Sequence, residues 1–374
     1  MSARSAKIEE FESAVNLINK VFRDLRNHKP TMQQEFPLLL NKDNIENMIV
    51  IEKDNKIVSD VNYLVQNVNI QGSAISMASI GGVCTDPDYE GNGYASKILD
   101  FVEDKMYKES VDVVSISGTR TLYTRRNCSL PKNFYKYTTY PKDIQINFEV
   151  KEYSEEYLDK MLEIYNQNST RFIRTKEEFK TLLKSATIPW GTFTYKKLVL
   201  LNKEEVIGYM VIRVIDEDNL YGEVREMYIK PAYTYDALRY VAHKCDLEYI
   251  INFVHVKDYI NQLDNYDEKV ISKMDGSIKI INFEAFSNKL RKYFEQYVAS
   301  DIINNIEFKQ IDDKYVVSYK DEKLVIKDIN TLNLLFFEGI DVVKDDIEEL
   351  DVIKEFTKRV FPINFVWSSN LNYQ

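Results

Sequence analysis

The sequence predicts a mixed α/β (α+β) protein in which one domain-sized unit occurs twice, followed by a different C-terminal unit. In the first unit, the patterns follow the order helix, hairpin, strand, glycine-rich loop, helix and strand, which is typical of a mixed α/β layer. The strand–turn–strand pattern of residues 49–65 recurs at residues 198–214, an offset of 149 residues. A repeat of this length indicates two copies of one unit.

The overall composition is that of a globular protein with two or three domains. The chain has 374 residues, of which 44% are hydrophobic and 29% are charged. Its net charge of −10 argues against general nucleic-acid binding, which requires a basic face. The same acidity mildly favours a polycationic acceptor.

Cysteine and histidine usage argues against disulfides and metal sites. The three cysteines are an odd number without paired spacing, so we expect a reducing, cytoplasmic location. They are Cys84, Cys128 and Cys245. The three histidines lie far apart, so no metal site is expected; they are His28, His243 and His255. No run approaches about 18 apolar residues, so we expect neither an export signal nor a membrane span.

The elements of the first unit follow from side-chain periodicity. Residues 8–22 carry apolar side chains at helical spacing, and residues 49–65 are typical of a strand, a polar turn and a strand. Residues 73–87 predict a third strand that runs into a glycine cluster. Residues 95–109 predict an amphipathic helix, and the β-branched run at residues 111–118 predicts a buried strand.

The second unit repeats this order without one connection. A helix at residues 157–167 precedes its hairpin, and a strand at 222–231 and a helix at 235–245 follow it. From Val65 to Ala95 is 30 positions, whereas the equivalent span from Val214 to Ala237 is 23. The second copy therefore lacks about seven residues, which are the glycine-rich loop. Because the fold forms without it, we interpret the loop as functional.

The region after residue 270 has a different pattern. Residues 276–298 predict a strand and an amphipathic helix, and residues 306–328 alternate like antiparallel strands joined by polar turns. The acidic residues 344–350 are typical of a solvated helix face. The last segment, residues 359–374, is too apolar for a free tail, so we expect it to dock on the folded protein.

The glycine-rich loop lies within GGVCTDPDYEGNGYASKIL, residues 81–99, which holds four of the chain's 11 glycines. A glycine turn that leads into a helix leaves backbone amides unpaired at the helix N-terminus, where they suit a phosphate. The motif fits neither the dinucleotide-binding fingerprint nor the P-loop. By itself it is consistent with an anion site or with a tight structural turn.

The order of elements and two motifs resemble the GCN5-related N-acetyltransferase (GNAT) family. The family's acetyl-CoA motif, Arg/Gln-x-x-Gly-x-Gly/Ala, aligns with residues 90–95, and LYTRRNC places Tyr123 at the tyrosine of a second family motif. The resemblance implies acetyl-CoA contacts from two groups of residues. The pantetheine arm would meet Val83, Cys84 and Thr85, and the pyrophosphate would meet Glu90, Gly91, Asn92, Gly93, Tyr94, Ala95 and Ser96.

The sequence departs from the family pattern at two places. Glu90 replaces Arg or Gln and puts a carboxylate near the expected pyrophosphate. The arginines that could offset it are Arg120, Arg125 and Arg126. Asn127 and Cys128 replace a Gly-Phe pair, a mild change because Asn tolerates the left-handed backbone.

Over nearly its full length the chain is similar to the enhanced intracellular survival type of acetyltransferase. This type has tandem GNAT domains and a C-terminal domain resembling a sterol carrier protein. The similarity implies an acetyl-CoA-binding GNAT domain at residues 1–148 and a degenerate GNAT-like domain without the CoA loop at 149–270. A sterol-carrier-like domain with a docked C-terminus would occupy residues 271–374.

The resemblance also implies a reaction. Acetyl-CoA would be the co-substrate, no metal would be needed, and the acceptor would be a primary amine of a small molecule, such as an aminoglycoside, or of a protein lysine. Tyr123 would be the general acid toward the CoA sulfur, unless it is an ordinary core tyrosine. The terminal carboxylate of Gln374 would be the base, unless the tail only packs at a domain interface.

Two other functions stay open at this stage. One is a non-catalytic acyl-CoA-binding or interaction protein, which Glu90 favours. The other is a lipid-binding carrier with a vestigial transferase. Neither nucleic acid nor a membrane is an expected partner, and a homo-oligomer is compatible with the sequence.

Overall fold

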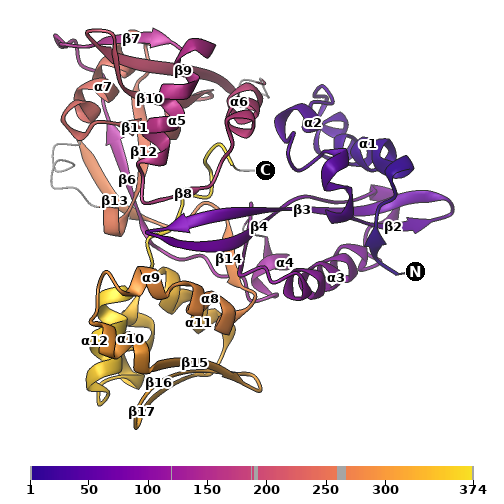
Figure 1. The fold of residues 1–374 in the computed structure, drawn as a ribbon. Helices are drawn as coiled ribbons and strands as arrows, with labels where there is room; N and C mark the ends of the chain where they lie inside the picture. Colours follow the sequence, from indigo (N-terminus) through magenta and orange to yellow (C-terminus); the bar gives the residue numbers. More distant parts are fainter. Residues whose placement is uncertain (1, 119, 187, 189–192, 259–266, 373–374) are drawn as a thin grey trace.

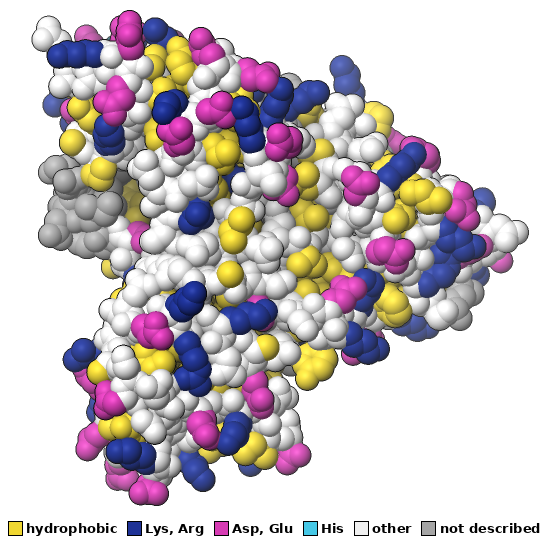
Figure 2. Space-filling view, in the orientation of Figure 1, with side chains coloured by type: hydrophobic (Ala, Val, Ile, Leu, Met, Phe, Trp, Pro, Cys, Tyr) yellow, Lys and Arg dark blue, Asp and Glu magenta, His cyan; other side chains and the backbone are white. Residues whose placement is uncertain are grey.

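The computed structural model describes residues 2–118, 120–186, 188, 193–258 and 267–372. In this structure the chain forms three lobes, and the C-terminal segment returns to lie between the first and second (Figure 1). Acidic and basic side chains are interspersed over the lobes on the face that Figure 2 shows. No helix of the described chain is both long and apolar enough to cross a membrane.

The first lobe is built on a seven-stranded sheet with helices on both faces. The strand order is β1-β2-β3-β4-β5-β14, and β8 pairs with β3. The strands are β1 (Arg4–Ser5), β2 (Met48–Lys53), β3 (Lys56–Ile70), β4 (Ser73–Thr85), β5 (Val113–Ile116), β8 (Thr170–Phe172) and β14 (Ser277–Ile280). The helices are α1 (Phe11–Phe22), α2 (Met32–Glu35), α3 (Tyr94–Lys108) and α4 (Thr121–Thr124).

Side-chain alternation in β2 explains the two layers of this lobe. Met48 and Val50 pack with α1 on one face of the sheet, whereas Ile49 and Ile51 pack with α3 on the other. All four side chains are fully buried. The strand is apolar throughout because both of its faces are covered.

The second lobe is built on another seven-stranded sheet, in the order β13-β6-β12-β11-β10-β9-β7. Its strands are β6 (Phe134–Thr139), β7 (Glu149–Glu152), β9 (Phe193–Asn202), β10 (Glu205–Asp216), β11 (Leu220–Ile229), β12 (Tyr249–His255) and β13 (Glu268–Ser272). Helix α7 (Pro231–Lys244) packs on one face, and α5 (Leu158–Asn166) and α6 (Lys176–Ser185) pack on the other.

The predicted repeat and its missing loop are confirmed. Strands β2 to β5 with α3 have their counterparts in β9 to β12 with α7, and β3 and β10 begin 149 residues apart. Eight residues, 86–93, connect β4 to α3, whereas the single residue Lys230 connects β11 to α7. The difference of seven residues is the glycine-rich loop.

The third lobe contains a three-stranded antiparallel sheet and short helices. Its strands are β15 (Ile306–Ile311), β16 (Lys314–Tyr319) and β17 (Glu322–Ile326). Its helices are α8 (Phe283–Lys289), α9 (Arg291–Phe294), α10 (Ser300–Asn305), α11 (Ile329–Phe337) and α12 (Asp351–Val360). Its core continues into the first sheet, where Val68, Ile70 and Met77 join the same apolar cluster.

Short 3-10 segments complete the described structure. They are η1 (Ile8–Glu10), η2 (Asp24–Arg26), η3 (Lys42–Asn47), η4 (Pro87–Tyr89), η5 (Glu155–Tyr157), η6 (Val256–Asp258) and η8 (Ile340–Asp346). The acidic stretch at 344–350 is exposed at its charged positions, as its pattern predicts.

Several strands cross between the lobes. Strand β6 joins the second sheet, while β8 and β14 pair with strands of the first. The domain boundaries after residues 148 and 270 stay a prediction. The strands β6, β8 and β14 connect the lobes, because each pairs within a sheet of another part of the chain.

Candidate active site

The first sheet opens at one point between two parallel strands. Strands β4 and β5 pair from Met77 with Val113 to Ile80 with Ile116, and the pairing ends there. Strand β4 nevertheless continues to Thr85 beside β3. The diverging strands leave a gap in the middle of the sheet, with unpaired backbone on β4 facing it.

A β-bulge lies in β4 beside this opening. Asp60 pairs with Cys84 and Asn62 pairs with Gly81, so β4 carries one residue more than β3 between these pairs. Gly82 takes up the bulge with a φ of +63°. A side chain there would also meet Asn62, since a Cβ atom would lie 2.9 Å from Asn62 Nδ2. Glycine is therefore required at this position on two grounds.

A cleft of about 360 Å³ extends from the bulge into the space between the first two lobes. Its first-lobe wall comes from β4, from the segment after β5, and from the α1–α2 region. Its second-lobe wall comes from the end of α6 and from β9, β10 and β11. Asn370 and Leu371 of the C-terminal segment close it. A cavity of this size suits a small molecule or the end of a larger one.

Tyr123 lies on the wall of this cleft. It belongs to the short helix α4, is 5% exposed, and its ring lies against Gly118. The helix ends in a turn in which Cys128 N donates to Tyr123 O at 3.1 Å. Asn127 in this turn has a φ of +62°, so it adopts the left-handed backbone that the sequence predicted.

The three predicted pantetheine residues take different positions. Val83 lines the cleft beside Gly81 and Gly82. The Cys84 side chain is buried among residues that pack with α1, and this burial raises its thiol pKa well above the usual value. The Thr85 hydroxyl lies 2.9 Å from that of Ser59. The bulge residues themselves, rather than the cysteine thiol, face the cleft.

The glycine-rich loop forms a separate exposed turn at the start of α3. Gly91 and Gly93 have φ values of +77° and +72°, and a Cβ atom at either position would meet open space. The Asn92 side chain closes the turn by donating to Tyr89 O at 2.9 Å. Glycine is needed here for its backbone conformation and not for lack of room.

The first amides of α3 fit the predicted anion site. The helix begins at Tyr94 and has no side-chain cap at its N-terminus. The N–H groups of Tyr94, Ala95 and Ser96 have no acceptor within the helix because they belong to its first turn. Together with the helix dipole they can bind an anion.

The Glu90 carboxylate lies beside this turn. Glu90 is exposed at the end of η4. Arg126 is engaged elsewhere, since its guanidinium contacts Asp100 at 2.6 Å and Glu103 at 2.7 Å. Arg120 lines the cleft instead. The third predicted partner of Glu90 is Arg125. It is exposed, it is not part of the cleft lining, and it forms no ion pair among the described contacts.

Charged residues that the sequence analysis did not identify also line the cleft. Arg23 and Glu35 form a two-pronged ion pair with Nη2–O distances of 2.7 Å to both carboxylate oxygens. From the second lobe, Arg213 contacts Glu223 at 2.9 Å, and Arg225 lies 3.5 Å from the same carboxylate. The signal in the sequence for Arg213 and Arg225 was the presence of charges inside two predicted strands, the mostly buried β10 and the half-buried β11.

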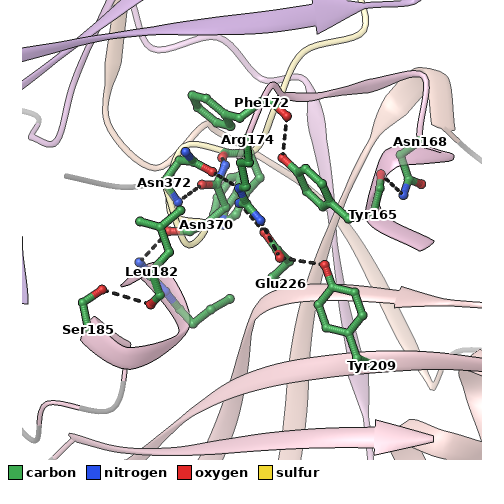
Figure 3. Close-up of polar contacts among 12 residues, drawn as sticks. Tyr165, Asn168, Phe172, Arg174, Leu182, Ser185, Tyr209, Glu226, Asn370 and Asn372 are labelled. Carbon is green, nitrogen blue, oxygen red and sulfur yellow. Dashed lines mark hydrogen bonds and ion pairs between the residues drawn. The ribbon is translucent and has the colours of Figure 1, made fainter. Parts of the chain in front are cut away.

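A buried polar network fixes the C-terminal segment at this cleft (Figure 3). Arg174 donates to both oxygens of Glu226, at 2.9 and 2.6 Å, and to Asn372 Oδ1 at 2.5 Å. Tyr209 donates to the same Glu226 carboxylate at 2.8 Å. The Arg174 guanidinium also stacks on the Tyr165 ring, 4.1 Å from its centroid. The predicted docking of the tail is thus confirmed up to Asn372.

Gln374, the predicted base, lies outside the described residues. The chain is described up to Asn372, one residue beyond Leu371 in the cleft wall. Among the residues described, no group of histidine, cysteine or acidic side chains could hold a metal ion.

The equivalent opening in the second sheet is occupied. Strands β11 and β12 pair from Tyr221 to Glu223 and then diverge, and β11 carries its own bulge at Arg225. The C-terminal segment enters this opening, where Trp367 stacks on Phe253 of β12 with ring centroids 4.1 Å apart. The remaining cavity of about 930 Å³ has no glycine-rich loop beside it.

Comparisons with known proteins agree with this geometry. Residues 2–130 match the acetyltransferase (GNAT) domain family. The match covers the bulged strand, the glycine-rich loop and Tyr123, so the GNAT domain contains the first-lobe half of the cleft.

Solved structures share the fold along almost the whole chain. A GCN5-related N-acetyltransferase from Anabaena variabilis is 14% identical, with a TM-score of 0.69. The alignment covers 97% of this chain and 98% of that one. Eis1 from Mycobacterium abscessus is 11% identical, with a TM-score of 0.60 over 99% of this chain and 100% of that one. A probable N-acyltransferase from Enterococcus faecalis is 16% identical, with a TM-score of 0.63 over 89% of each chain. No curated protein matches the sequence.

These findings confirm the predicted fold class and the resemblance. GNAT-like sheets are followed by a C-terminal sheet and helices, and the likeness to the Eis1 structure extends over this whole arrangement. The likeness of the third lobe to a sterol carrier protein stays a prediction. A GNAT domain is an N-acyltransferase domain that uses an acyl-CoA donor, and the open, bulged strand of this chain lies within it.

Proposed function

We propose that the chain is an acetyltransferase of the cytoplasm that moves an acetyl group from acetyl-CoA to a primary amine of a small molecule or of a protein lysine. The observation that carries the proposal is the combination of an open bulge and a glycine-rich turn in the GNAT domain alone. The second sheet has an opening and a bulge, but it lacks the turn. Donor binding is therefore assigned to the first lobe.

Binding of acetyl-CoA would use the two surfaces described above. The first-turn amides of α3, with Gly91 to Gly93, would receive the pyrophosphate. Strand β4 pairs with β5 only up to Ile80, so the side of its backbone that faces away from β3 at Val83 to Thr85 would receive the pantetheine arm and bring the thioester to the cleft. Amide groups at the bulge would then donate to the carbonyl oxygen as negative charge develops on it.

The transfer itself needs two proton movements. The amine nitrogen attacks the carbonyl carbon, and its proton passes to a base. The C–S bond of the tetrahedral intermediate then breaks, and the leaving sulfur takes the proton of the Tyr123 hydroxyl, which solvent later restores. A positioned acid of this kind contributes about 100-fold to 10,000-fold to such reactions.

The base is proposed to be the terminal carboxylate of Gln374. Support comes from Asn370 and Leu371 in the cleft wall and from the Arg174 network that holds Asn372. Because the described chain ends at Asn372, beside the cleft wall, a terminal carboxylate two residues further on would be within reach of an acceptor bound beside Tyr123. Removal of residues 373–374 should lower kcat at least about 100-fold while Tm stays within a few degrees. Full activity of the shortened chain would reject this base.

A direct assay tests the proposal. Purified protein is titrated with acetyl-CoA by calorimetry, and release of free CoA thiol is then followed with a panel of primary amines. Binding followed by amine-dependent release supports the acetyltransferase. Binding without release for any amine would instead favour the second function, a non-catalytic acyl-CoA-binding protein, for which the exposed Glu90 carboxylate beside the turn is the specific observation.

A further inference from the structure

The charge of the cleft differs in sign from the charge of the chain. The whole sequence carries a net charge of −10. The residues that line the cleft, however, include five arginines and a single acidic residue, Glu35. The five are Arg23, Arg26, Arg120, Arg213 and Arg225. Neither lysine nor aspartate is among the described residues of this lining.

Internal ion pairs neutralise only part of this positive charge. Glu35 forms an ion pair with Arg23, and Glu223 forms ion pairs with both Arg213 and Arg225. Among the described residues, two carboxylates therefore stand against five guanidinium groups, an excess of three positive charges. A terminal carboxylate from Gln374 in the cleft, as proposed above, would offset only one of them.

Two of the arginines are exposed at the cleft and available to a ligand. Arg26 ends the 3-10 segment η2, and Arg120 precedes α4 and its Tyr123. Neither guanidinium group makes a hydrogen bond or an ion pair among the described contacts, although the backbone of each residue does. On the opposite wall, Arg213 has a buried Nε atom that lacks a partner in the described part of the chain. Arginines from both lobes thus line one space that a ligand can fill.

We propose that the acceptor is a small primary amine that also carries an anionic group, a carboxylate or a phosphate, held by the arginines of the cleft. This inference rests on the proposed acetyltransferase function and names the substrate class of the same site. Arginine suits such a group because its planar fork can donate two parallel hydrogen bonds to a carboxylate or phosphate. A polycation, which the net charge of the sequence favours, would be repelled at close range.

The same charges assist the chemistry at the amine. A primary amine in water is mostly protonated near neutral pH and cannot attack a thioester. Neighbouring positive charges disfavour its protonated form, so the bound amine loses its proton more readily. The arginines therefore bind one end of the acceptor and favour the nucleophilic form of the other.

The donor is the other ligand that these arginines could bind, because CoA also carries phosphates. The geometry favours the acceptor. The exposed loop of residues 91–96, where the pyrophosphate is expected, is not part of the cleft lining. Arg23, Arg26 and Glu35 come from the α1–α2 region, and Arg213 and Arg225 come from the second lobe, so all five of these residues are distant from that loop in the sequence.

Matched pairs of amines test the inference. CoA-thiol release is measured with β-alanine and β-alaninamide, with glucosamine 6-phosphate and glucosamine, and with kanamycin as a polycation. We expect kcat/KM to be at least about 10-fold higher for the anionic member of one pair. The carboxylate and phosphate pairs separate the two kinds of anion. Equal or better turnover of kanamycin or of the uncharged partners would overturn the inference and leave the acetyltransferase function standing.

Variants then assign the effect to the cleft. Arg26→Gln and Arg120→Gln should each raise KM for the anionic amine about 10-fold and reduce its advantage over the uncharged partner. Lys29→Gln is the matched control, since it removes one exposed charge from the loop beside Arg26 but outside the cleft lining. A rise in the acetyl-CoA Kd with unchanged amine preference would mean that the arginines bind the donor, and would overturn the inference. Turnover of none of the amines would overturn it together with the proposed function.

Discussion

The two GNAT-like sheets of this chain share a bulge and an opening between strands, but they differ in the connection that follows the bulged strand. Both have a bulge and a pair of parallel strands that diverge, at Ile80 in the first sheet and at Glu223 in the second. In the first sheet, eight residues lead into α3 and present its amides; in the second, one residue leads into α7. The opening is a property of the fold, whereas donor binding depends on a short added loop.

The buried position beneath each bulge shows the same contrast. Asp60 and Tyr209 are 149 residues apart and both are fully buried. Tyr209 is satisfied by the Glu226–Arg174 pair, which also holds the tail. Asp60 lies beside the Asn62 side chain and the Val61 backbone, and neither of its carboxyl oxygens has a well-aligned hydrogen bond to a described residue. The second sheet therefore holds the C-terminal segment through a satisfied polar network, whereas the first sheet has an unsatisfied polar group beside the proposed donor site.

The largest expected effect is on kcat, and it comes from the first lobe, which contains the proposed proton donor. Tyr123→Phe removes the proposed proton donor and should lower kcat about 100-fold to 10,000-fold with little change in the acetyl-CoA Kd. Tyr107→Phe, in the exposed part of α3, is the control. Steady-state thiol release and calorimetry measure both quantities. A Tyr123→Phe enzyme with normal kcat would show this tyrosine to be a packing residue.

The buried Arg174–Glu226 ion pair of the second lobe should be important for stability. Arg174→Ala leaves the Glu226 carboxylate buried and unpaired, so the free energy of unfolding should fall by about 3–5 kcal/mol. Arg359→Ala, which breaks an exposed pair with Glu355, should change it by at most about 1 kcal/mol. Urea unfolding of the three proteins gives the comparison. Equal losses for both variants would mean that the buried network does not hold the tail.

The glycine-rich turn gives a smaller effect on donor binding. Gly93→Ala places a side chain at a φ of +72°, which strains the turn and shifts the first amides of α3. We expect the acetyl-CoA Kd to rise about 10-fold. Gly72→Ala in the β3–β4 turn is a matched control, because Gly72 also has positive φ and open space around it. Its Kd should match the wild type, and a similar rise in both variants would reject the loop as the anion site.

The last prediction concerns the pH dependence of stability. Burial raises the pKa of Asp60 to about 8, so between about pH 4 and pH 8 the folded protein holds a proton that the unfolded chain has lost. The free energy of unfolding should therefore fall as pH rises through this window, by at most about 1.4 kcal/mol per pH unit. Asp60→Asn should remove this slope. Urea unfolding at several pH values measures it, and parallel profiles for the two proteins would contradict the assignment.

The sequence by itself determined the elements and their repetition. Apolar periodicity located the helices and hairpins, since burial of one face or both fixes the pattern along the chain. The missing seven residues identified the glycine-rich loop as an addition to the fold, and the motif positions of Gly91, Gly93 and Tyr123 indicated a resemblance to the GNAT family. These are local features, which a single segment of sequence can express.

Only the tertiary structure decided what the cleft contains. Arg26, Arg120, Glu35 and Arg213 come from distant segments and meet because two sheets and the tail pack together. Net charge could not reveal this, since the −10 of the whole chain says nothing of which charges share one enclosed space. The sequence therefore predicted a donor site from local motifs, whereas the acceptor site, assembled from two lobes and the C-terminal segment, required the folded chain.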